Sequence, residues 1–290
     1  MGPEASHSRD REGKARYGLA MAFDVTDFKT LMTLESHGPD VFVGVGPVYP
    51  WGRVYGGQVV AQALRAAFST VEEGYVVHSL HSYFIRGGEC EEPIRYEIDR
   101  IRNGRSFLTR RVVARQSCGP ILNLSASFQI REDQADVQEC AIPTGLPQPE
   151  DLPSEDWSPI LKRRSIPTEG AHAAAWVRVE GPLADDPITQ SCALAYTSDD
   201  IPTEAASKSH PLHPTLTQDP RSWGETFIGA SLDHTIWFHR PGRNQDWVLH
   251  DFQGHGVVGG RGLTIGQIYS RDGIHMATVA QEILIRERTR

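Results

Sequence analysis

The sequence predicts an α+β protein in which an antiparallel sheet curls around a central helix, and it predicts this unit twice. Three observations lead to that fold: one strongly apolar helix near residue 60, four strand-like runs directly after it, and a weak repeat of these runs toward the carboxyl end. A sheet with one apolar face must bury that face against another element. A buried helix followed by an antiparallel meander is therefore typical of this class.

The first half contains the clearest helix of the chain. A short amphipathic helix is expected over 23–32 and a strand over 41–50, before Gly56 and Gly57 open the main helix. Its apolar stripe recurs at helical spacing, at Val59, Val60, Ala63, Leu64 and Ala67. Small alanines on the remaining faces indicate that protein surrounds this helix on most sides.

A four-stranded meander follows the helix. The runs rich in Val, Ile, Phe, Tyr and Thr predict strands over 76–86, 94–102, 107–116 and 121–131. Asn103-Gly104 separates the second run from the third, and Asn-Gly is a strong hairpin signal because both residues tolerate positive φ. The segment 132–170 then becomes polar and rich in proline, as a linker would.

The carboxyl-terminal part repeats the meander at a constant offset of 154 residues. The matches are Phe84-Ile-Arg-x-Gly88 with Phe238-His-Arg-x-Gly242, Gly119 with Gly273, and Ala126 with Ala280. An offset that persists through a whole meander predicts two copies of one fold. The second copy should have its helix over 189–199, followed by a long proline-bearing loop over 201–222. We therefore expect a disordered tail over 1–20, units over 21–131 and 171–290, and a linker over 132–170.

Composition excludes several classes of function. The net charge of −8 disfavours a protein that grips nucleic acid or an anionic membrane. The four cysteines are far apart, so we expect reduced thiols rather than a disulfide framework or a zinc ribbon. No run approaches the 18 apolar residues that a membrane span needs. The polar start is unlike a signal peptide, and Gly2 fits a myristoylation pattern only loosely. We expect a cytoplasmic protein without metal or bound cofactor.

Three motifs resemble functional sites, and each has a simpler interpretation. Gly254-His-Gly-Val-Val-Gly259 matches a dinucleotide fingerprint, but a strand rather than a helix follows it, so we expect a hairpin end. His210 and His213 stand among prolines with no helix to hold a metal, which favours a solvated loop. Asp233-His234 resembles an acid–base pair, but neighbours on a strand point to opposite faces.

Six segments resemble the acyl-CoA thioesterase II (TesB-like) family. They are Arg53-Val-Tyr-Gly-Gly-Gln-Val-Val-Ala-Gln-Ala-Leu64, His78-Ser-Leu-His-Ser-Tyr-Phe-Ile-Arg86, Asn103-Gly-Arg-Ser-Phe107, Leu194-Ala-Tyr-Thr-Ser-Asp199, Asp233-His-Thr-Ile-Trp-Phe-His-Arg-Pro241 and Ala280-Gln-Glu282. The matches run in order through nearly the whole chain. The resemblance implies a double hotdog fold, in which two antiparallel sheets each wrap around a central helix. It also implies hydrolysis of fatty acyl-CoA to free fatty acid and coenzyme A, and so a role in fatty acid and lipid metabolism.

The resemblance also implies a catalytic trio. In this family an Asp, a Thr or Ser, and a Gln hold the attacking water, and by motif these fall on Asp199, Ser231 and Gln281. From the residues alone, Asp199 reads as a helix-end or turn residue and Ser231 as a capping hydroxyl or part of a site. Gln281 alone reads as a strand residue on a solvated face. Within the family pattern, Asp199 would be the general base and the other two would position the water, without a covalent intermediate.

Two other functions stay open at this point. A hotdog enoyl-CoA hydratase carries an Asp-x4-His pair, whereas Glu204 and Ala205 stand five residues after Asp199 and Asp200. A non-catalytic acyl-CoA-binding protein would share the fold but not need the trio. The expected partner is acyl-CoA, with no nucleic acid and no membrane span, and a dimer or tetramer is open. The end Arg288-Thr-Arg290 does not match the Ser-Lys-Leu of peroxisomal relatives.

Overall fold

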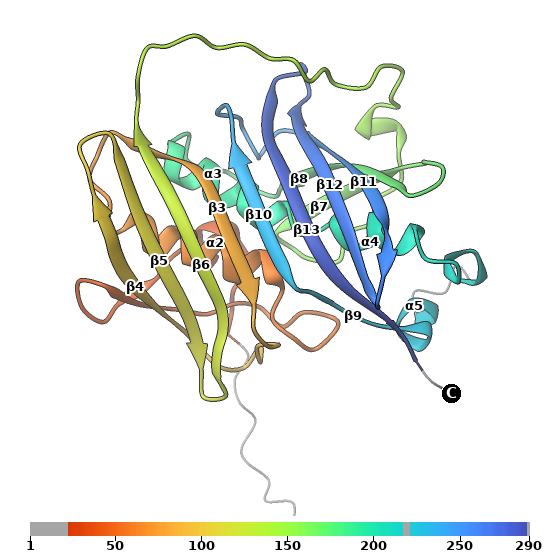
Figure 1. Cartoon of the computed structure of the whole chain (residues 1–290), viewed down its shortest axis with the longest axis horizontal. Helices are drawn as coiled ribbons and strands as arrows, with labels where there is room; N and C mark the ends of the chain where they lie inside the picture. The colour runs from red at the N-terminus through yellow and green to blue at the C-terminus, as the bar shows by residue number, and fades with distance from the viewer. Residues whose placement is uncertain (1–22, 217–220, 289–290) are drawn as a thin grey trace, which may run out of the picture.

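One antiparallel sheet runs through the whole protein (Figure 1). The computed structural model describes residues 23–216 and 221–288, so the expected tail over 1–20 lies outside it. The strands are β1 Glu35–Ser36, β2 Val41–Gly44, β3 Tyr75–Phe84, β4 Ile94–Asn103, β5 Phe107–Gln116, β6 Gly119–Ile130, β7 Leu161–Ile166, β8 His172–Val179, β9 Phe227–Ser231, β10 Asp233–Phe238, β11 Val248–Val258, β12 Arg261–Ser270 and β13 His275–Glu287.

The strand order has a mirrored pattern. It reads β1-β2-β4-β5-β6-β3-β10-β13-β12-β11-β8-β7, with β9 paired to β13. The meander β3–β6 and the meander β10–β13 thus meet at the β3–β10 pair, with their outer strands facing away from each other. The two antiparallel sheets that the sequence leads us to expect are therefore joined into one continuous antiparallel sheet.

The helices lie on one face of this sheet (Figure 1). They are α1 Phe28–Leu31, α2 Gly56–Phe68, α3 Pro187–Thr197, α4 Pro202–Lys208 and α5 Arg221–Thr226, with 3₁₀ turns at Pro149–Asp151 and His213–Thr215. Helix α2 contacts β4, β5 and β6, as its all-round burial predicts. None of the helices in the described ranges is long and apolar enough to span a membrane.

The second half differs from the expected copy in its helices. Helix α3 contacts mainly α2, whereas α4 covers β8, β11, β12 and β13. The segment 201–222 was expected to be a loop, but Pro202 occupies the first turn of α4, where its missing N–H costs no hydrogen bond. The helix lying on the second meander is therefore α4, and α3 joins the two halves.

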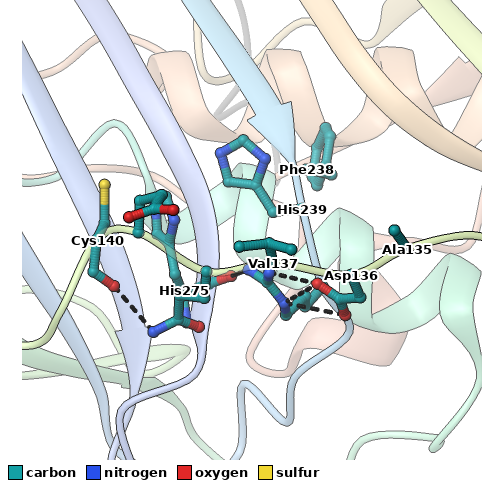
Figure 2. A pocket seen from close by; sticks show the side chains of 10 residues that line it. Ala135, Asp136, Val137, Cys140, Phe238, His239 and His275 are labelled. Carbon is teal, nitrogen blue, oxygen red and sulfur yellow. Dashed lines mark hydrogen bonds and ion pairs between the residues drawn. The ribbon is translucent and has the colours of Figure 1, made fainter.

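The proline-rich connection is tied to the second meander. Residues 135–140 run over the ends of β10 and β13 and line a shallow pocket there (Figure 2). Asp136 pairs with Arg240, and the Gln138 side chain accepts a hydrogen bond from the His275 N–H at 2.9 Å. Residues 161–166, which were expected to be linker, instead form the edge strand β7 against β8. The connection is thus partly built into the sheet.

The four cysteines are free thiols, as expected. Cys90 and Cys192 are buried, while Cys118 and Cys140 are exposed. Burial raises the pKa of the Cys192 thiol to about 12, so this residue behaves as a small apolar side chain.

Glycine permits the close approach of α2 to α3. A Cβ atom at Gly57 would lie 2.3 Å from the backbone oxygen of Tyr196 and 2.5 Å from the ring of Tyr55. The Tyr55 hydroxyl donates to the same Tyr196 oxygen at 2.9 Å. The amino end of α2 therefore meets the carboxyl end of α3 with no room for a side chain between them.

We predict that Gly57→Ala forces α2 away from α3 and lowers the free energy of unfolding by about 1–3 kcal/mol, because the backbone oxygen of Tyr196 cannot move independently. Urea denaturation measures the change. The matched control is Gly224→Ala in α5, where a Cβ would meet nothing within 4 Å and helix propensity favours alanine. Equal stability of the two variants would contradict the tight packing.

Candidate active site

Asp199 lies just beyond the carboxyl end of α3 and is only 7 % exposed. The helix is fixed at its start by Pro187 in the first turn and by Asp186, whose carboxylate accepts a hydrogen bond from the Thr189 N–H at 2.9 Å. The carboxyl end of a helix carries partial negative charge, which disfavours a neighbouring carboxylate. A buried Asp199 therefore needs hydrogen-bond donors from other elements.

The amino end of α2 supplies one of these donors. The backbone N–H of Gly57 hydrogen-bonds Asp199, and the first turn of α2 has no side-chain cap that competes for it. A Cβ at Gly56 would lie 2.5 Å from Asp199 Oδ2 and 3.0 Å from the Phe84 ring, so only glycine fits at this position. The partial positive charge at the start of α2 thus faces the carboxylate.

A β-bulge at Leu232 separates β9 from β10. Ser231 pairs with Ile283, and Thr235 pairs with Ala280. The two paired positions are four residues apart on β9–β10 but only three residues apart on β13. One residue is therefore extra on the β9–β10 side, and the simple alternation of side chains breaks at Leu232.

The bulge puts Ser231 on the inner face of the sheet, which is the face that the helices cover. Because Ile283 and Gln281 are two residues apart on β13, they share a face, and Ser231 joins them there. Strict alternation from Asp233 would put Ser231 on the same face as Asp233, but alternation does not hold across a bulge. Asp233 is instead half-buried and accepts a hydrogen bond from the Glu282 N–H at 2.7 Å, which is a structural role.

The structure brings Asp199, Ser231 and Gln281 into direct contact. Gln281 Nε2 donates to Asp199 Oδ1 at 2.8 Å and to Ser231 Oγ at 2.8 Å. Ser231 Oγ donates to Asp199 Oδ1 at 3.1 Å. Gln281 is fully buried, so its reading as a solvated strand residue is wrong, whereas Ser231 is half-buried. Ser231 is therefore the most accessible residue of the three.

The surroundings of Asp199 tune its protonation. Burial raises the pKa of Asp199 to about 6, even though hydrogen bonds from Gln281, Ser231 and the Gly57 N–H favour the ionised form. The carboxylate is thus mostly ionised at neutral pH but is a stronger base than an exposed Asp. A base of this strength can accept a proton from a positioned water.

Sequence reasoning missed His234, which is fully buried beside the trio. Its Nδ1 lies 2.5 Å from Gln281 Oε1, and its Nε2 lies 2.8 Å from Ser198 Oγ. Burial lowers the pKa of His234 to about 4, so the ring is neutral at physiological pH. Its position next to Asp233 was the only signal in the sequence, and that signal suggested a different partner.

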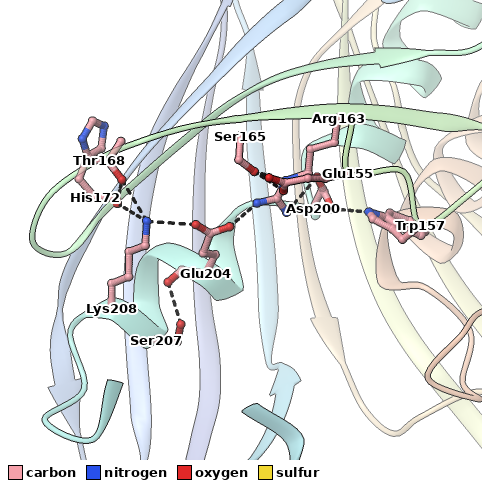
Figure 3. Close-up of polar contacts among 10 residues, drawn as sticks. All are labelled: Glu155, Trp157, Arg163, Ser165, Thr168, His172, Asp200, Glu204, Ser207 and Lys208. Atoms are coloured by element: carbon pink, nitrogen blue, oxygen red, sulfur yellow. Dashed lines mark hydrogen bonds and ion pairs between the residues drawn. The ribbon is translucent and has the colours of Figure 1, made fainter. Parts of the chain in front are cut away.

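Asp200, the neighbour of Asp199, is anchored by a buried ion-pair network (Figure 3). The Trp157 indole N–H donates to Asp200 Oδ1 at 2.9 Å, and Arg163 Nη1 lies 3.6 Å from Oδ2. Burial raises the pKa of Asp200, against the opposing effects of Arg163 and Trp157. Arg163 also pairs with Glu204 on α4. The turn that carries Asp199 is therefore held by Arg163 of β7, which Glu204 of α4 in turn keeps in place, and no local motif reveals this arrangement.

Aromatic rings form one side of the site. The Tyr55 ring lies 5.2 Å from Tyr196 and 5.0 Å from Trp157, and Trp51 stacks on Tyr49 with centroids 5.3 Å apart. Burial raises the pKa of Tyr55 well above its ordinary value, and the negative charge of Asp199 adds to the effect. Tyr55 is therefore the ring of this cluster that lies near the carboxylate.

The other motifs have structural roles. Residues 254–259 form the end of the β11–β12 hairpin, as expected. His210 is buried against Phe227, with ring centroids 4.7 Å apart, so the expected solvated loop is wrong at this residue. Within residues 23–216 and 221–288, no group of three or more His, Cys, Asp or Glu side chains could hold a metal ion.

Comparison with protein families gives two matches in chain order. Residues 46–129 match the acyl-CoA thioesterase N-terminal domain, and residues 152–284 match the acyl-CoA thioesterase family. The chain is similar to acyl-CoA thioesterase 2 of Haemophilus influenzae, with 34 % identity over 88 % of this chain and 96 % of that protein.

Solved structures give the same result. An acyl-CoA thioesterase II from Mycobacterium marinum superposes with a TM-score of 0.77 at 34 % identity, covering 90 % of this chain and 99 % of that one. A hot dog fold protein of unknown function from Alicyclobacillus acidocaldarius gives a TM-score of 0.74 at 21 % identity, over 90 % and 98 % of the two chains. The second likeness supports the hotdog fold.

We predict that the Asp199 carboxyl titrates with a midpoint near pH 6, because burial disfavours its charged form. Gln281→Met removes an amide donor to the carboxylate and should move the midpoint upward. Carboxyl-carbon NMR of aspartate-labelled protein measures both, and the Asp199→Asn spectrum identifies the resonance. A midpoint at about 4 would show instead that the carboxyl is well solvated.

Proposed function

Because the chain belongs to the acyl-CoA thioesterase family, we propose that it hydrolyses fatty acyl-CoA to free fatty acid and coenzyme A with a water held by Asp199, Ser231 and Gln281. One observation carries the assignment of residues: Gln281 Nε2 donates to both Asp199 and Ser231, which joins three distant segments at one point. A carboxylate, a hydroxyl and an amide offer the donors and acceptors that fix a water, without a strong nucleophile among them.

In the proposed reaction Asp199 accepts a proton from the water and later returns it to the leaving thiolate. Asp199 accepts a proton from the water while the water oxygen bonds to the thioester carbonyl carbon, which gives a tetrahedral oxyanion. Collapse of this intermediate breaks the carbon–sulfur bond and expels the coenzyme A thiolate, and the protonated Asp199 supplies the proton that makes it a thiol. The raised pKa of Asp199 suits both steps, since a group with a pKa near the working pH can accept and return a proton.

The orientation of α2 favours the anionic intermediate. Its amino end abuts Asp199 through Gly56 and Gly57, so the positive end of the helix lies beside the proposed reaction centre. Fixed dipoles that face developing negative charge lower the barrier because they need no reorganisation. Ser231 and Gln281 would then serve mainly to orient the water.

We further propose a double hotdog organisation with units over 21–131 and 171–290 and a linker over 132–170. The mirrored strand order about β3 and β10 supports it, as does the family likeness. In the proposed arrangement α2 is the central helix of the first unit, while α3 and α4 together fill that place in the second. The proposed site lies at the seam, with α2 from one unit and the trio from the other.

The alternatives differ in a measurable product. An acyl-CoA-binding protein would release no free thiol, and a hydratase would convert an enoyl-CoA to a hydroxyacyl-CoA with the thioester intact. The position five residues after Asp199 holds Glu204, which is paired with Arg163 and Lys208 rather than free to act on a substrate. This observation favours hydrolysis over hydration.

We place the enzyme in the cytoplasm, which the four free thiols support. We also expect a dimer or tetramer. The outer face of β3 and β10 exposes Tyr83 and Trp237, by 63 % and 39 %, and an oligomer contact would cover them. Sedimentation equilibrium of the whole chain measures its mass in solution.

We predict that Asp199→Ala lowers kcat for acyl-CoA hydrolysis by about 10²–10⁴-fold, because it removes the general base. Ser231→Ala and Gln281→Ala should lower kcat with much smaller effects on KM, whereas Ser231→Thr should stay active because it keeps the hydroxyl. Thiol release from acyl-CoA substrates of increasing chain length measures these effects and also reports the chain-length preference.

Asp233→Asn is the control for the trio. It is nearly isosteric, lies two residues from Ser231, and contacts none of the trio side chains in the described structure. We expect it to retain activity. The assignment fails if folded Asp233→Asn is inactive while Asp199→Ala keeps full turnover.

A further inference from the structure

We propose that His234 is a positioning residue that holds the Gln281 amide in the orientation that serves Asp199. The inference rests on the proposed site and extends it to a residue that touches none of the reacting atoms. Its basis is a chain of contacts among buried side chains, Ser198–His234–Gln281–Asp199. The two ends of this chain, Ser198 and Asp199, are neighbours in sequence, so the contacts form a closed ring.

The hydrogen-bonding capacity of these groups fixes where the protons lie. With Gln281 Nε2 directed at Asp199 and Ser231, its Oε1 faces His234 Nδ1 at 2.5 Å. An amide oxygen can only accept, so Nδ1 must carry the proton of the neutral ring. Nε2 is then the acceptor, so the single Ser198 hydroxyl proton points to it at 2.8 Å rather than to the other acceptor in reach, Ala195 O at 3.1 Å.

The opposite orientation of the amide fails when Asp199 is ionised. It would place Gln281 Oε1 against Asp199 Oδ1 at the same short distance, with an acceptor facing an acceptor. It would also require Nδ1 of His234 to be unprotonated. An Nδ1–H at His234 therefore selects the one orientation in which Gln281 supports both the base and the serine.

Burial makes this selection strong. His234 and Gln281 are both fully buried, with 0 % of their surface accessible to solvent. Water therefore cannot replace a missing donor at Gln281 Oε1. The low pKa of His234, about 4, keeps a single proton on the ring throughout the neutral range. An unpaired buried amide oxygen is costly, and the amide would rotate or shift to satisfy it.

The key comparison is between His234→Asn and His234→Gln. The Asn amide nitrogen can take the place of Nδ1 and keep a donor toward Gln281, whereas the longer Gln side chain directs its amide toward Ser198. We expect His234→Gln to lower kcat by about 10–100-fold with KM changed less than about threefold. His234→Asn should retain kcat within about fivefold of the wild type.

His250 provides the matched control. It is also a fully buried histidine with a lowered pKa, about 3, but it lies on β11 and hydrogen-bonds no member of the trio in the described structure. His250→Gln should leave kcat unchanged once the fraction of folded protein is accounted for. Equal losses of kcat in the His250 and His234 variants would assign a merely structural role to His234 and overturn the proposal.

A double-mutant cycle tests whether His234 acts through Gln281. In the Gln281→Ala background, His234→Gln should change kcat by less than about threefold, because the group that it positions is absent. His234→Gln alone should also move the acidic limb of the kcat/KM profile to higher pH, since a loosened Gln281 amide stabilises the Asp199 carboxylate less. Additive losses of kcat in the cycle would overturn the proposal.

Nitrogen NMR of the unmodified protein provides a test that needs no variant to fold. The proposal requires the neutral Nδ1–H tautomer at His234 at pH 7, and observation of the Nε2–H tautomer would overturn it. The test is also separable from the proposed function. If Asp199→Ala and Gln281→Ala reduce turnover but His234→Gln does not, only the role of His234 fails, whereas full activity of Asp199→Ala rejects the site itself.

Discussion

The pairing of β3 with β10 joins the two halves of the chain, and the positions of the functional groups depend on it. Tyr83 lies opposite Asp233, and the pairing continues past the bulge where the Phe84 N–H donates to Leu232 O at 2.9 Å. With this register fixed, the inner face of the seam brings α2 against α3. The positive amino end of α2 and the negative carboxyl end of α3 then meet at Asp199, whose carboxylate accepts a backbone hydrogen bond from α2.

Much of the fold follows from local pattern. The four strands of the first meander lie within two residues of the ranges that composition and turn signals predict, because alternating apolar residues and an Asn-Gly turn act locally. Helix α4 and strand β7 could not be predicted this way. Pro202 is a breaker within a helix but acceptable in its first turn, and the charged residues of β7 are stabilised by partners far away in sequence.

The candidate site, like the fold, can be predicted from the sequence only in part. Family motifs in the sequence lead to Asp199, Ser231 and Gln281. Without those motifs, Asp199 would be taken for a turn residue and Gln281 for a strand residue on a solvated face. The reason is physical: Gln281 is buried only because Asp199 and His234 satisfy both ends of its amide. A single inserted residue at Leu232 reverses the face of Ser231 relative to Asp233, and alternation rules cannot anticipate a bulge.

The internal repeat also has a consequence for symmetry. At the offset of 154 residues, the counterpart of His234 is Leu80, which pairs with Ala126 on β6. Both of these side chains are apolar and buried. The first meander therefore has an apolar contact at the position where the second has the hydrogen bonds of His234. The mirrored strand order therefore does not repeat the polar contacts of His234 in the first meander, and at this position the first meander contributes packing alone.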